Sequence, residues 1–201
     1  MGIGLTTLFS LKGGTGKSSL SMAISLDCKR KGLDVPVLTN DRVSIVEDVL
    51  GEDRGMVLRR QEDFPEELDT NDDFILDLGG FLDERISKVI AKSKNVVVPT
   101  VSDYGSLQAT ITTINDLKSL NKNIIIILNR IDRDEFLGLY EVIRDKCGAY
   151  PIFPIKNTKA FENSQAQQKS IWQMMKDEPR FKRPYGEVQK QLEKVLETLE
   201  K

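Results

Sequence analysis

A glycine-rich segment near the start of the chain joins an apolar run to a helical pattern. The apolar run at 5–11 predicts a buried strand, and the spacing of apolar residues over 18–31 predicts a helix. Gly32 follows at the position that helix C-caps prefer. Between them, residues 12–19 have the sequence K-G-G-T-G-K-S-S. A strand, a glycine-rich loop and a helix are therefore expected in direct succession.

The rest of the chain continues this alternation. Further strands are expected at 35–38, 74–78, 96–99, 124–128 and 150–155, and further helices at 82–92, 103–120, 134–147 and 186–201. Two of the strands, 96–99 and 124–128, are short and fully apolar, which is typical of central strands in a parallel sheet covered on both faces. The pattern predicts an α/β fold, a doubly wound and mostly parallel sheet with helices on both faces.

The length of the chain suits a single domain. With 201 residues, of which 39% are hydrophobic and 30% charged, it can bury a core, and we expect one domain over 1–201. The helix at 186–201 has one apolar face and one of mixed charge, so we expect it to pack on the domain rather than on a membrane surface. The stretch 51–73 is the least regular, and is either a surface excursion or a segment that contacts a partner.

Composition excludes several kinds of site. The chain has no histidine, which removes Ser-His and Cys-His catalysis and histidine-ligated metals. Cys28 and Cys147 lie far apart and are interpreted as reduced thiols rather than a disulfide. The formal net charge of −2 predicts neither a nucleic-acid binder nor a membrane binder, and no apolar run approaches the ~20 residues of a membrane span. We therefore expect a cytoplasmic protein.

Residues 12–19 fit a cradle for phosphate groups. Phosphate oxygens must come within hydrogen-bond distance of several backbone N–H groups, and side chains would block that approach. Gly13, Gly14 and Gly16 leave the space open and give the loop backbone freedom. The helix that follows adds unpaired N–H groups and the positive end of its dipole.

The polar side chains of the loop complete a predicted site for Mg-ATP. Lys17 would contact the β- and γ-phosphates, and the Ser18 hydroxyl would ligate Mg²⁺. Thr15 and Ser19 belong to the same cradle. Leu11 stands where the strict pattern G-x-x-x-x-G-K-[ST] has its first glycine, so a glycine-rich turn without a ligand is the alternative.

The loop sequence resembles the deviant Walker A loop of the ParA/MinD family of P-loop ATPases. The resemblance extends in the same order over most of the chain and is closest to short ParA-type partition ATPases. The hallmark of the family is an additional lysine at the start of the loop, here Lys12. The resemblance implies that Lys12 reaches across an ATP-dependent homodimer to the phosphates of the partner's ATP, where a cation offsets developing charge. A surface lysine on a loop is the alternative.

After the second predicted strand the family usually has D-x-D-P-Q, whereas this chain has Thr39-Asn40-Asp41-Arg42-Val43. Only the second acid remains, and the resemblance implies that Asp41 acts near Mg²⁺ and the attacking water. The changes at Thr39 and Arg42 leave the hydrolysis rate open. From the residues alone, Asp41 could instead cap the following helix.

The third predicted strand ends in a carboxylate. The segment 74–80, F-I-L-D-L-G-G, resembles a Walker B strand, with Asp77 at the edge of the sheet where ligands bind in such folds. Asp77 would hold Mg²⁺ through a water molecule, opposite Ser18. The two glycines that follow would let the loop move near the γ-phosphate.

Asn129 and Arg130 close the predicted strand at 124–128. Family members often have an asparagine here that reads the adenine edge, and an amide can both donate to and accept from adenine. A turn residue at the end of a strand is the alternative.

The resemblance implies a weak ATPase that dimerises on ATP and partitions DNA or positions a cargo with a ParB-like or other adaptor protein. Seven cations are candidates for non-specific DNA binding and a nucleoid location, or are simply solvated: Lys156, Lys159, Lys169, Lys176, Arg180, Lys182 and Arg183. A membrane is not expected as the bound surface. The alternatives are a small-molecule ATP-dependent ligase of the same superfamily and a nucleotide-binding scaffold with little hydrolysis.

Overall fold

A computed structural model describes residues 2–58, 72–80, 82–121 and 123–201. Its strands are β1 (Leu5–Ser10), β2 (Val37–Thr39), β3 (Gly55–Val57), β4 (Phe74–Gly79), β5 (Asn95–Thr100), β6 (Ile124–Ile131) and β7 (Ile152–Lys156). They form one sheet in the order β3-β2-β4-β1-β5-β6-β7, and every neighbouring pair is parallel. The predicted α/β fold is confirmed, with a sheet that is parallel throughout.

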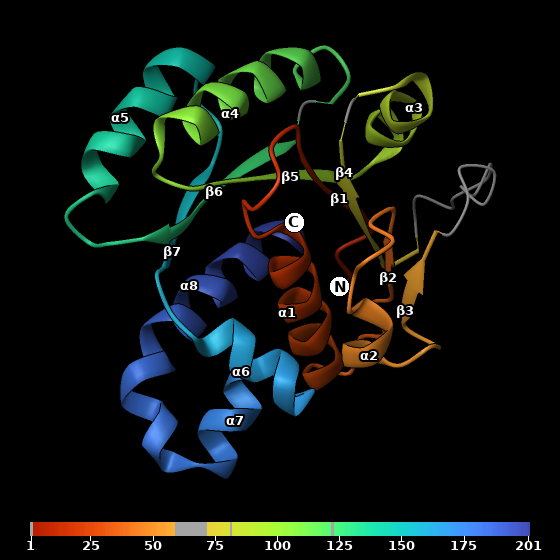
Figure 1. Cartoon of the computed structure of the whole chain (residues 1–201), viewed down its shortest axis with the longest axis vertical. Helices are drawn as coiled ribbons and strands as arrows, with labels where there is room; N and C mark the ends of the chain where they lie inside the picture. The colour runs from red at the N-terminus through yellow and green to blue at the C-terminus, as the bar shows by residue number, and fades with distance from the viewer. Residues whose placement is uncertain (1, 59–71, 81, 122) are drawn as a thin grey trace.

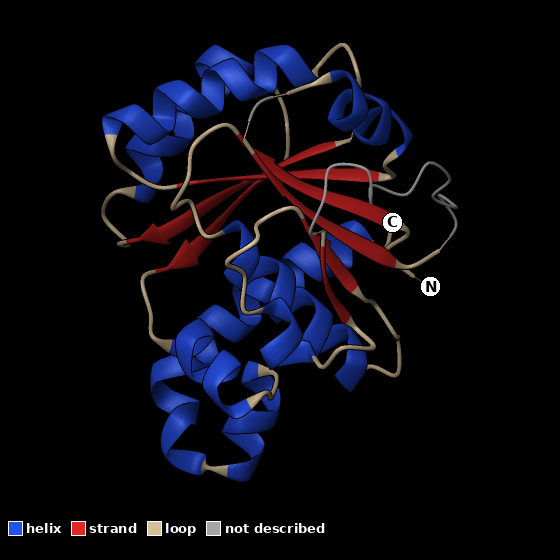
Figure 2. Ribbon diagram, turned by 45° about the vertical axis from the view of Figure 1, so that its right-hand side comes forward, coloured by secondary structure: helices blue, strands red, loops and turns tan. Residues whose placement is uncertain are grey.

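Helices cover both faces of this sheet (Figure 1). One face carries α3 (Glu84–Lys92), α4 (Tyr104–Leu117) and α5 (Phe136–Cys147). The other carries α1 (Lys17–Arg30), α2 (Val46–Leu50), α6 (Ala160–Gln167), α7 (Ile171–Asp177) and α8 (Lys182–Leu199), with a 3₁₀ turn, η2 (Pro179–Phe181), before α8. Figure 2 shows the sheet between these two layers.

Each layer packs on its own half of the core. Along β5, Val97 joins the cluster under α1 and α8, whereas Val96 and Val98 join the cluster under α3, α4 and α5. Side chains of a strand alternate between the two faces, so a strand covered on both sides is mostly apolar on both of them. This explains why the central strands are runs of β-branched residues rather than alternating patterns.

The C-terminal helix α8 has its apolar face buried. In α8, Val188, Leu192 and Leu196 are at most 1% exposed. The amide nitrogen of Asn95 also donates to the carbonyl oxygen of Leu199, at 3.1 Å. None of the described helices is both long and apolar enough to cross a membrane.

Several short elements lie outside the sequence-based prediction. These are α2, β3, α6, α7 and η2, which have between three and eight residues each. Helix α8 begins at Lys182 rather than at the predicted position 186. Pro184 lies in its first turn, where the missing N–H has no intrahelical partner to lose, so the proline does not delay the helix. Of the irregular stretch 51–73, residues 59–71 lie outside the described part of the chain.

The sheet order places the start of α1 at its centre. Strand β1 lies between β4 and β5, and the chain leaves it toward β2 on one side before returning later to β5 on the other. Ligands of open parallel sheets bind beside the carboxyl ends of the strands at such a switch point. The loop between β1 and α1 lies at this position.

Candidate functional site

The loop from β1 to α1 bends through two glycines with left-handed backbone. Gly14 has a φ of 79° and Gly16 a φ of 89°, and Gly16 is the residue directly before α1. Residues with a Cβ rarely adopt these angles, whereas glycine does so freely. Helix α1 has no side-chain cap and no acidic residue in its first turn. Its first N–H groups are thus left for an anion at the positive end of the helix dipole.

Asn129, at the end of β6, supports this loop from below. Its amide nitrogen donates to the carbonyl oxygen of Thr15 at 2.9 Å, and its amide oxygen accepts from the backbone N–H of Arg130 at 3.0 Å. A Cβ added to Gly16 would lie 2.1 Å from that amide nitrogen. Both ends of the Asn129 amide are therefore engaged with backbone, and adenine recognition by this residue stays a prediction.

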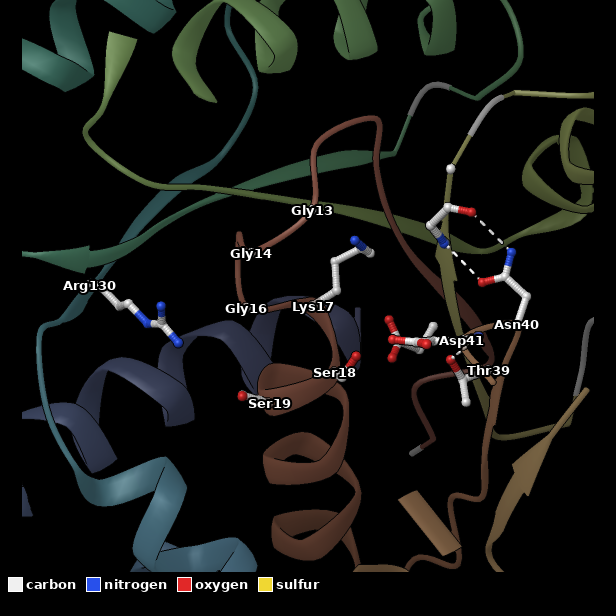
Figure 3. A pocket seen from close by; sticks show the side chains of 13 residues that line it. Gly13, Gly14, Gly16, Lys17, Ser18, Ser19, Thr39, Asn40, Asp41 and Arg130 are labelled. Carbon is white, nitrogen blue, oxygen red and sulfur yellow. Dashed lines mark hydrogen bonds between the residues drawn. The ribbon is translucent and has the colours of Figure 1, made fainter. Parts of the chain in front are cut away.

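A cavity of about 500 Å³ opens above the loop. Figure 3 shows its lining, with Lys17 on one side of the loop and Arg130 on the other. Arg130 is exposed and has a φ of 56°, an unusual backbone conformation for a residue with a side chain. The predicted site residues that line the cavity are Gly13, Gly14, Gly16, Lys17, Ser18, Ser19, Asp41, Asp77 and Arg130. Lys12, Thr15 and Asn129 lie beside it.

Lys17 is partly removed from water at the first position of α1. Burial lowers the pKa of its ammonium group, and the nearby carboxylates of Asp77 and Asp41 act in the opposite direction. A desolvated cation beside unpaired backbone amides is attracted strongly to a polyanion, because less water screens the interaction. This arrangement fits phosphate binding.

Asp77 lies at the bottom of the cavity and is only 3% exposed. Burial raises the pKa of its carboxyl group, against hydrogen bonds from Ser18 and Thr39 and the charge of Lys17. Its Oδ1 atom has no hydrogen-bond partner in the structure. A buried carboxylate oxygen without a partner is costly, and a cation or its water ligands would satisfy it.

The residues present fit a magnesium ion that is shared with a ligand. Ser18, Asp41 and Asp77 offer the hard oxygen donors that Mg²⁺ prefers, and all three line the same cavity. Among the described residues, no group of three or more Asp, Glu, Cys or His side chains forms a metal cage. Mg²⁺ commonly keeps its waters and binds one or two carboxylates together with substrate phosphates.

Asp41 lies in the loop after β2, exposed at the mouth of the cavity. Its backbone N–H donates to the Thr39 hydroxyl at 3.1 Å, and its Oδ1 accepts from the N–H of Val43 at 3.1 Å. The alternative role as a helix cap is wrong, because the residue before α2 is Ile45 and this helix has no side-chain cap. The Asp41 carboxylate therefore organises its own loop.

Lys12 points away from the cavity. Its Nζ lies 2.7 Å from Oδ1 of Asp103, and both side chains are well exposed. Asp103 is also the N-cap of α4, where it accepts from the backbone N–H of Ser106. The Lys12 ammonium and Ser106 together lower the pKa of the Asp103 carboxyl group to about 2. The lysine is thus held on the surface by a residue of the same chain.

Sequence reasoning gave Asn40 no role, and the structure places it in the lining of the cavity. Its side chain makes two hydrogen bonds to the backbone of Gly79. Asn40 stands between Thr39 and Asp41, at the unspecified position of the family motif. The only signal available was the residue type, since an amide that follows a strand often bonds to backbone.

Comparisons with known proteins agree with this geometry. Residues 6–171 match the family model described as the CobQ/CobB/MinD/ParA nucleotide binding domain. Among the curated proteins, none matches the chain.

Three solved structures share the fold at low identity. An ATP complex of McdA from Cyanothece has a TM-score of 0.69 and 14% identity, and covers 99% of this chain and 97% of that one. The septum site-determining protein MinD from Pyrococcus horikoshii, complexed with Mg-ADP, has a TM-score of 0.64 and 18% identity, with 97% and 93% covered. A plasmid partition protein from Borrelia burgdorferi has a TM-score of 0.54 and 15% identity, with 83% and 98% covered.

The family match spans the central strand β1, the phosphate loop that follows it from Lys12 on, and the end of strand β4, which carries Asp77. The chain belongs to the CobQ/CobB/MinD/ParA nucleotide-binding family.

Proposed function

We propose that this protein binds Mg-ATP in the cavity above the β1–α1 loop, dimerises on it, and hydrolyses it slowly to partition DNA or position a cargo. The observation that carries the proposal is the pair of lysines at the two ends of one phosphate loop. Lys17 is desolvated inside the cavity, and Lys12 is exposed outside it. Lys17 serves the nucleotide of its own chain, and Lys12, held by an exposed ion pair with Asp103, would exchange that partner for the phosphates of a second chain.

Within one chain, different residues would bind the phosphates, the nucleoside and the magnesium ion. The backbone amides of 13–18 and Lys17 would bind the phosphates, and Arg130 would lie toward the nucleoside end of the cavity. Ser18 and Asp77 would hold Mg²⁺, which when bound neutralises charge on the phosphates. Asp41, whose loop lies at the cavity mouth, would orient the attacking water.

The surface around the cavity suits a second copy of the chain. Five large hydrophobic side chains are exposed among the described residues, and three of them, Val43, Ile45 and Tyr104, lie close in sequence to Asp41 or Asp103. Val43 follows Asp41 in the same loop, and Tyr104 follows the Asp103 that holds Lys12. Exposed apolar residues gathered at one face mark contact surfaces. A face-to-face dimer would cover them and bring Lys12 to the partner's phosphates.

The names of the structural neighbours support the cellular role without fixing it. One neighbour is a plasmid partition protein, and another is a septum site-determining MinD. We infer that this chain likewise moves or positions DNA or another cellular cargo, through an adaptor protein that binds only the dimer. ATP binding would recruit the adaptor and hydrolysis would release it.

Three of the seven cations predicted for DNA binding form exposed ion pairs with carboxylates. Lys156 pairs with Glu187, Lys169 with Asp177 and Arg180 with Glu178. The four remaining candidates are Lys159, Lys176, Lys182 and Arg183. DNA phosphates would have to displace the carboxylates of the three paired cations, so we expect binding through this set to be weak and to decrease steeply with salt. Retention on non-specific duplex DNA at low salt, measured with ATP present, tests this part, and no retention at any salt concentration removes DNA from the proposal.

Light scattering after gel filtration tests the dimer. With Mg-ATP, the wild type shifts from monomer to dimer, whereas Lys12→Ala stays monomeric because the partner's phosphates lose their second cation. Lys88→Ala is the matched control, since Lys88 is an exposed lysine on α3 that pairs with Glu84 within its own helix. A wild type that elutes identically with and without nucleotide would count against the proposal.

A further inference from the structure

A side chain joins the loop that follows β2 to the last residue of β4. The Asn40 amide nitrogen donates to the carbonyl oxygen of Gly79 at 3.0 Å, and its amide oxygen accepts from the N–H of Gly79 at 3.0 Å. Figure 3 shows both bonds at the edge of the cavity. The backbone pairing of the two strands ends nearby, where Thr39 faces Asp77. The Asn40 amide thus continues the ladder in place of a peptide group.

This contact fixes groups on both sides of the cavity. Gly79 lies against Lys17, because a Cβ on Gly79 would be 3.3 Å from the lysine Nζ. Asp41 follows Asn40 directly, and its N–H is held by the Thr39 hydroxyl. One amide side chain therefore connects the loop that carries Asp41 with the strand end that carries Asp77.

We propose that Asn40 is a positioning residue that sets the separation of Asp41 and Asp77 for a magnesium ion bound with a nucleoside triphosphate. The inference rests on the proposed function for the identity of the ligand. Asn40 touches neither the phosphates nor the metal in this scheme. It acts through Gly79 and through its own loop, so that both carboxylates are in place before the ligand arrives.

The chemistry of an amide explains why asparagine is required. The contact needs one donor and one acceptor at the same reach, and the asparagine side chain supplies both. An aspartate has the same shape but only acceptors, so one of its oxygens would face the Gly79 carbonyl oxygen and repel it. It would also add a third carboxylate beside Asp41 and Asp77. Alanine removes both side-chain hydrogen bonds and leaves the backbone N–H of residue 40, which donates to the Asp77 carbonyl oxygen at 3.4 Å, as the contact between the two segments.

Removing the Asn40 side chain should raise the Mg²⁺ concentration that nucleotide binding requires, and should leave nucleotide affinity without metal nearly unchanged. The backbone amides and Lys17, which would hold the nucleotide without metal, do not depend on Asn40. Removing an outer partner of metal-binding groups typically weakens metal affinity about 10- to 100-fold. We therefore expect Asn40→Ala to need at least about tenfold more Mg²⁺ for half-maximal binding of the non-hydrolysable analogue AMPPNP.

The test is a Mg²⁺ titration of AMPPNP and ADP binding to the wild type, Asn40→Ala and Asn40→Asp. Both variants are expected to need more Mg²⁺ and to lose the preference for AMPPNP over ADP, while ADP affinity without Mg²⁺ changes less than about threefold. Asn115→Ala, an exposed asparagine on α4, serves as the control. Hydrogen exchange of the Gly79 amide, without nucleotide, should accelerate in Asn40→Ala.

The outcomes separate the inference from the function on which it rests. A magnesium midpoint of Asn40→Ala within about twofold of the wild type overturns the inference, since this substitution removes both hydrogen bonds without adding a charge. A wild type that binds Mg-AMPPNP without dimerising or hydrolysing ATP contradicts the proposed function, yet the titration still reads the role of Asn40. A wild type that binds no nucleotide contradicts both.

Discussion

At the scale of single residues, the two lysines of the loop differ by their surroundings. Lys17 sits among buried groups, and its pKa is lowered mainly by burial. Lys12 is exposed and is occupied by Asp103 in the isolated chain. An exposed ion pair contributes little to stability, so a strong anion can displace its carboxylate easily. The ion pair with Asp103 therefore positions Lys12 but is weak enough to be exchanged for an anion.

Substitutions of Asp41 and Lys17 should affect ATP binding and ATP hydrolysis differently. At saturating Mg²⁺, Asp41→Ala is expected to retain ATP binding and to lose hydrolysis by about 100-fold or more, because excess metal offsets a weaker magnesium site but does not replace a group that orients the attacking water. Lys17→Ala should lose both. Nucleotide titration and steady-state phosphate release measure the two quantities. Normal hydrolysis by Asp41→Ala would show that its assigned role is mistaken.

The pKa of the Asp103 carboxyl group should change when the Lys12 ammonium group is removed. Its pKa is lowered to about 2 by Lys12 and Ser106, and Lys12→Ala should raise the pKa while leaving it below the ordinary value, because Ser106 still donates. The folded pKa is the lower one, so this pair's contribution to stability is complete above about pH 4 and is lost as the pH falls toward 2. A carbon-13 NMR titration of the carboxyl group that gives identical values in both proteins would disprove the coupling.

At the scale of elements, the phosphate loop depends on its contact with the neighbouring strand β6. Gly16 fits against Asn129, and that asparagine holds the Thr15 carbonyl. The loop is thus shaped by a strand more than 100 positions away in the sequence. Rigid support of this kind lets backbone amides converge on an anion without reorganising when it binds.

Two glycine substitutions in the same loop should behave differently. Gly16→Ala combines a φ of 89° with a Cβ placed 2.1 Å from the Asn129 amide, so it should lower the free energy of unfolding by about 2 kcal/mol or more. Gly13→Ala meets no atom within 4 Å and should change that free energy by at most about 0.5 kcal/mol. Chemical denaturation of both variants is the measurement. Equal stability of the two would refute the packing of Gly16 on Asn129.

The long elements were predictable from the sequence, and the short ones were not. The strand β6 and the helices α1 and α4 follow clear patterns of burial, so their places agree with the prediction to within a few residues. The three-residue β3 and five-residue α2 are too short for a periodic pattern to repeat in them. Such pieces are fixed by contacts with the rest of the fold, which a local pattern does not contain.

At the scale of the whole molecule, the fold gathers the site from distant segments. The sheet order brings the ends of β1, β2, β4 and β6 to one edge, and each contributes a residue at or beside the cavity. Residue type and order sufficed to predict Lys17, Ser18 and Asp77. They did not show that Asn40 joins Gly79 or that Asp103 holds Lys12, because these pairs depend on side-chain geometry between separate loops.

Calorimetric titration of the purified protein with AMPPNP, with and without Mg²⁺, tests the central claim most directly. The account predicts one nucleotide bound per chain, tighter with Mg²⁺ than without it, and no detectable binding to Lys17→Ala. A folded wild type that binds no nucleotide with Mg²⁺, or a Lys17→Ala variant that binds as well as the wild type, would contradict it.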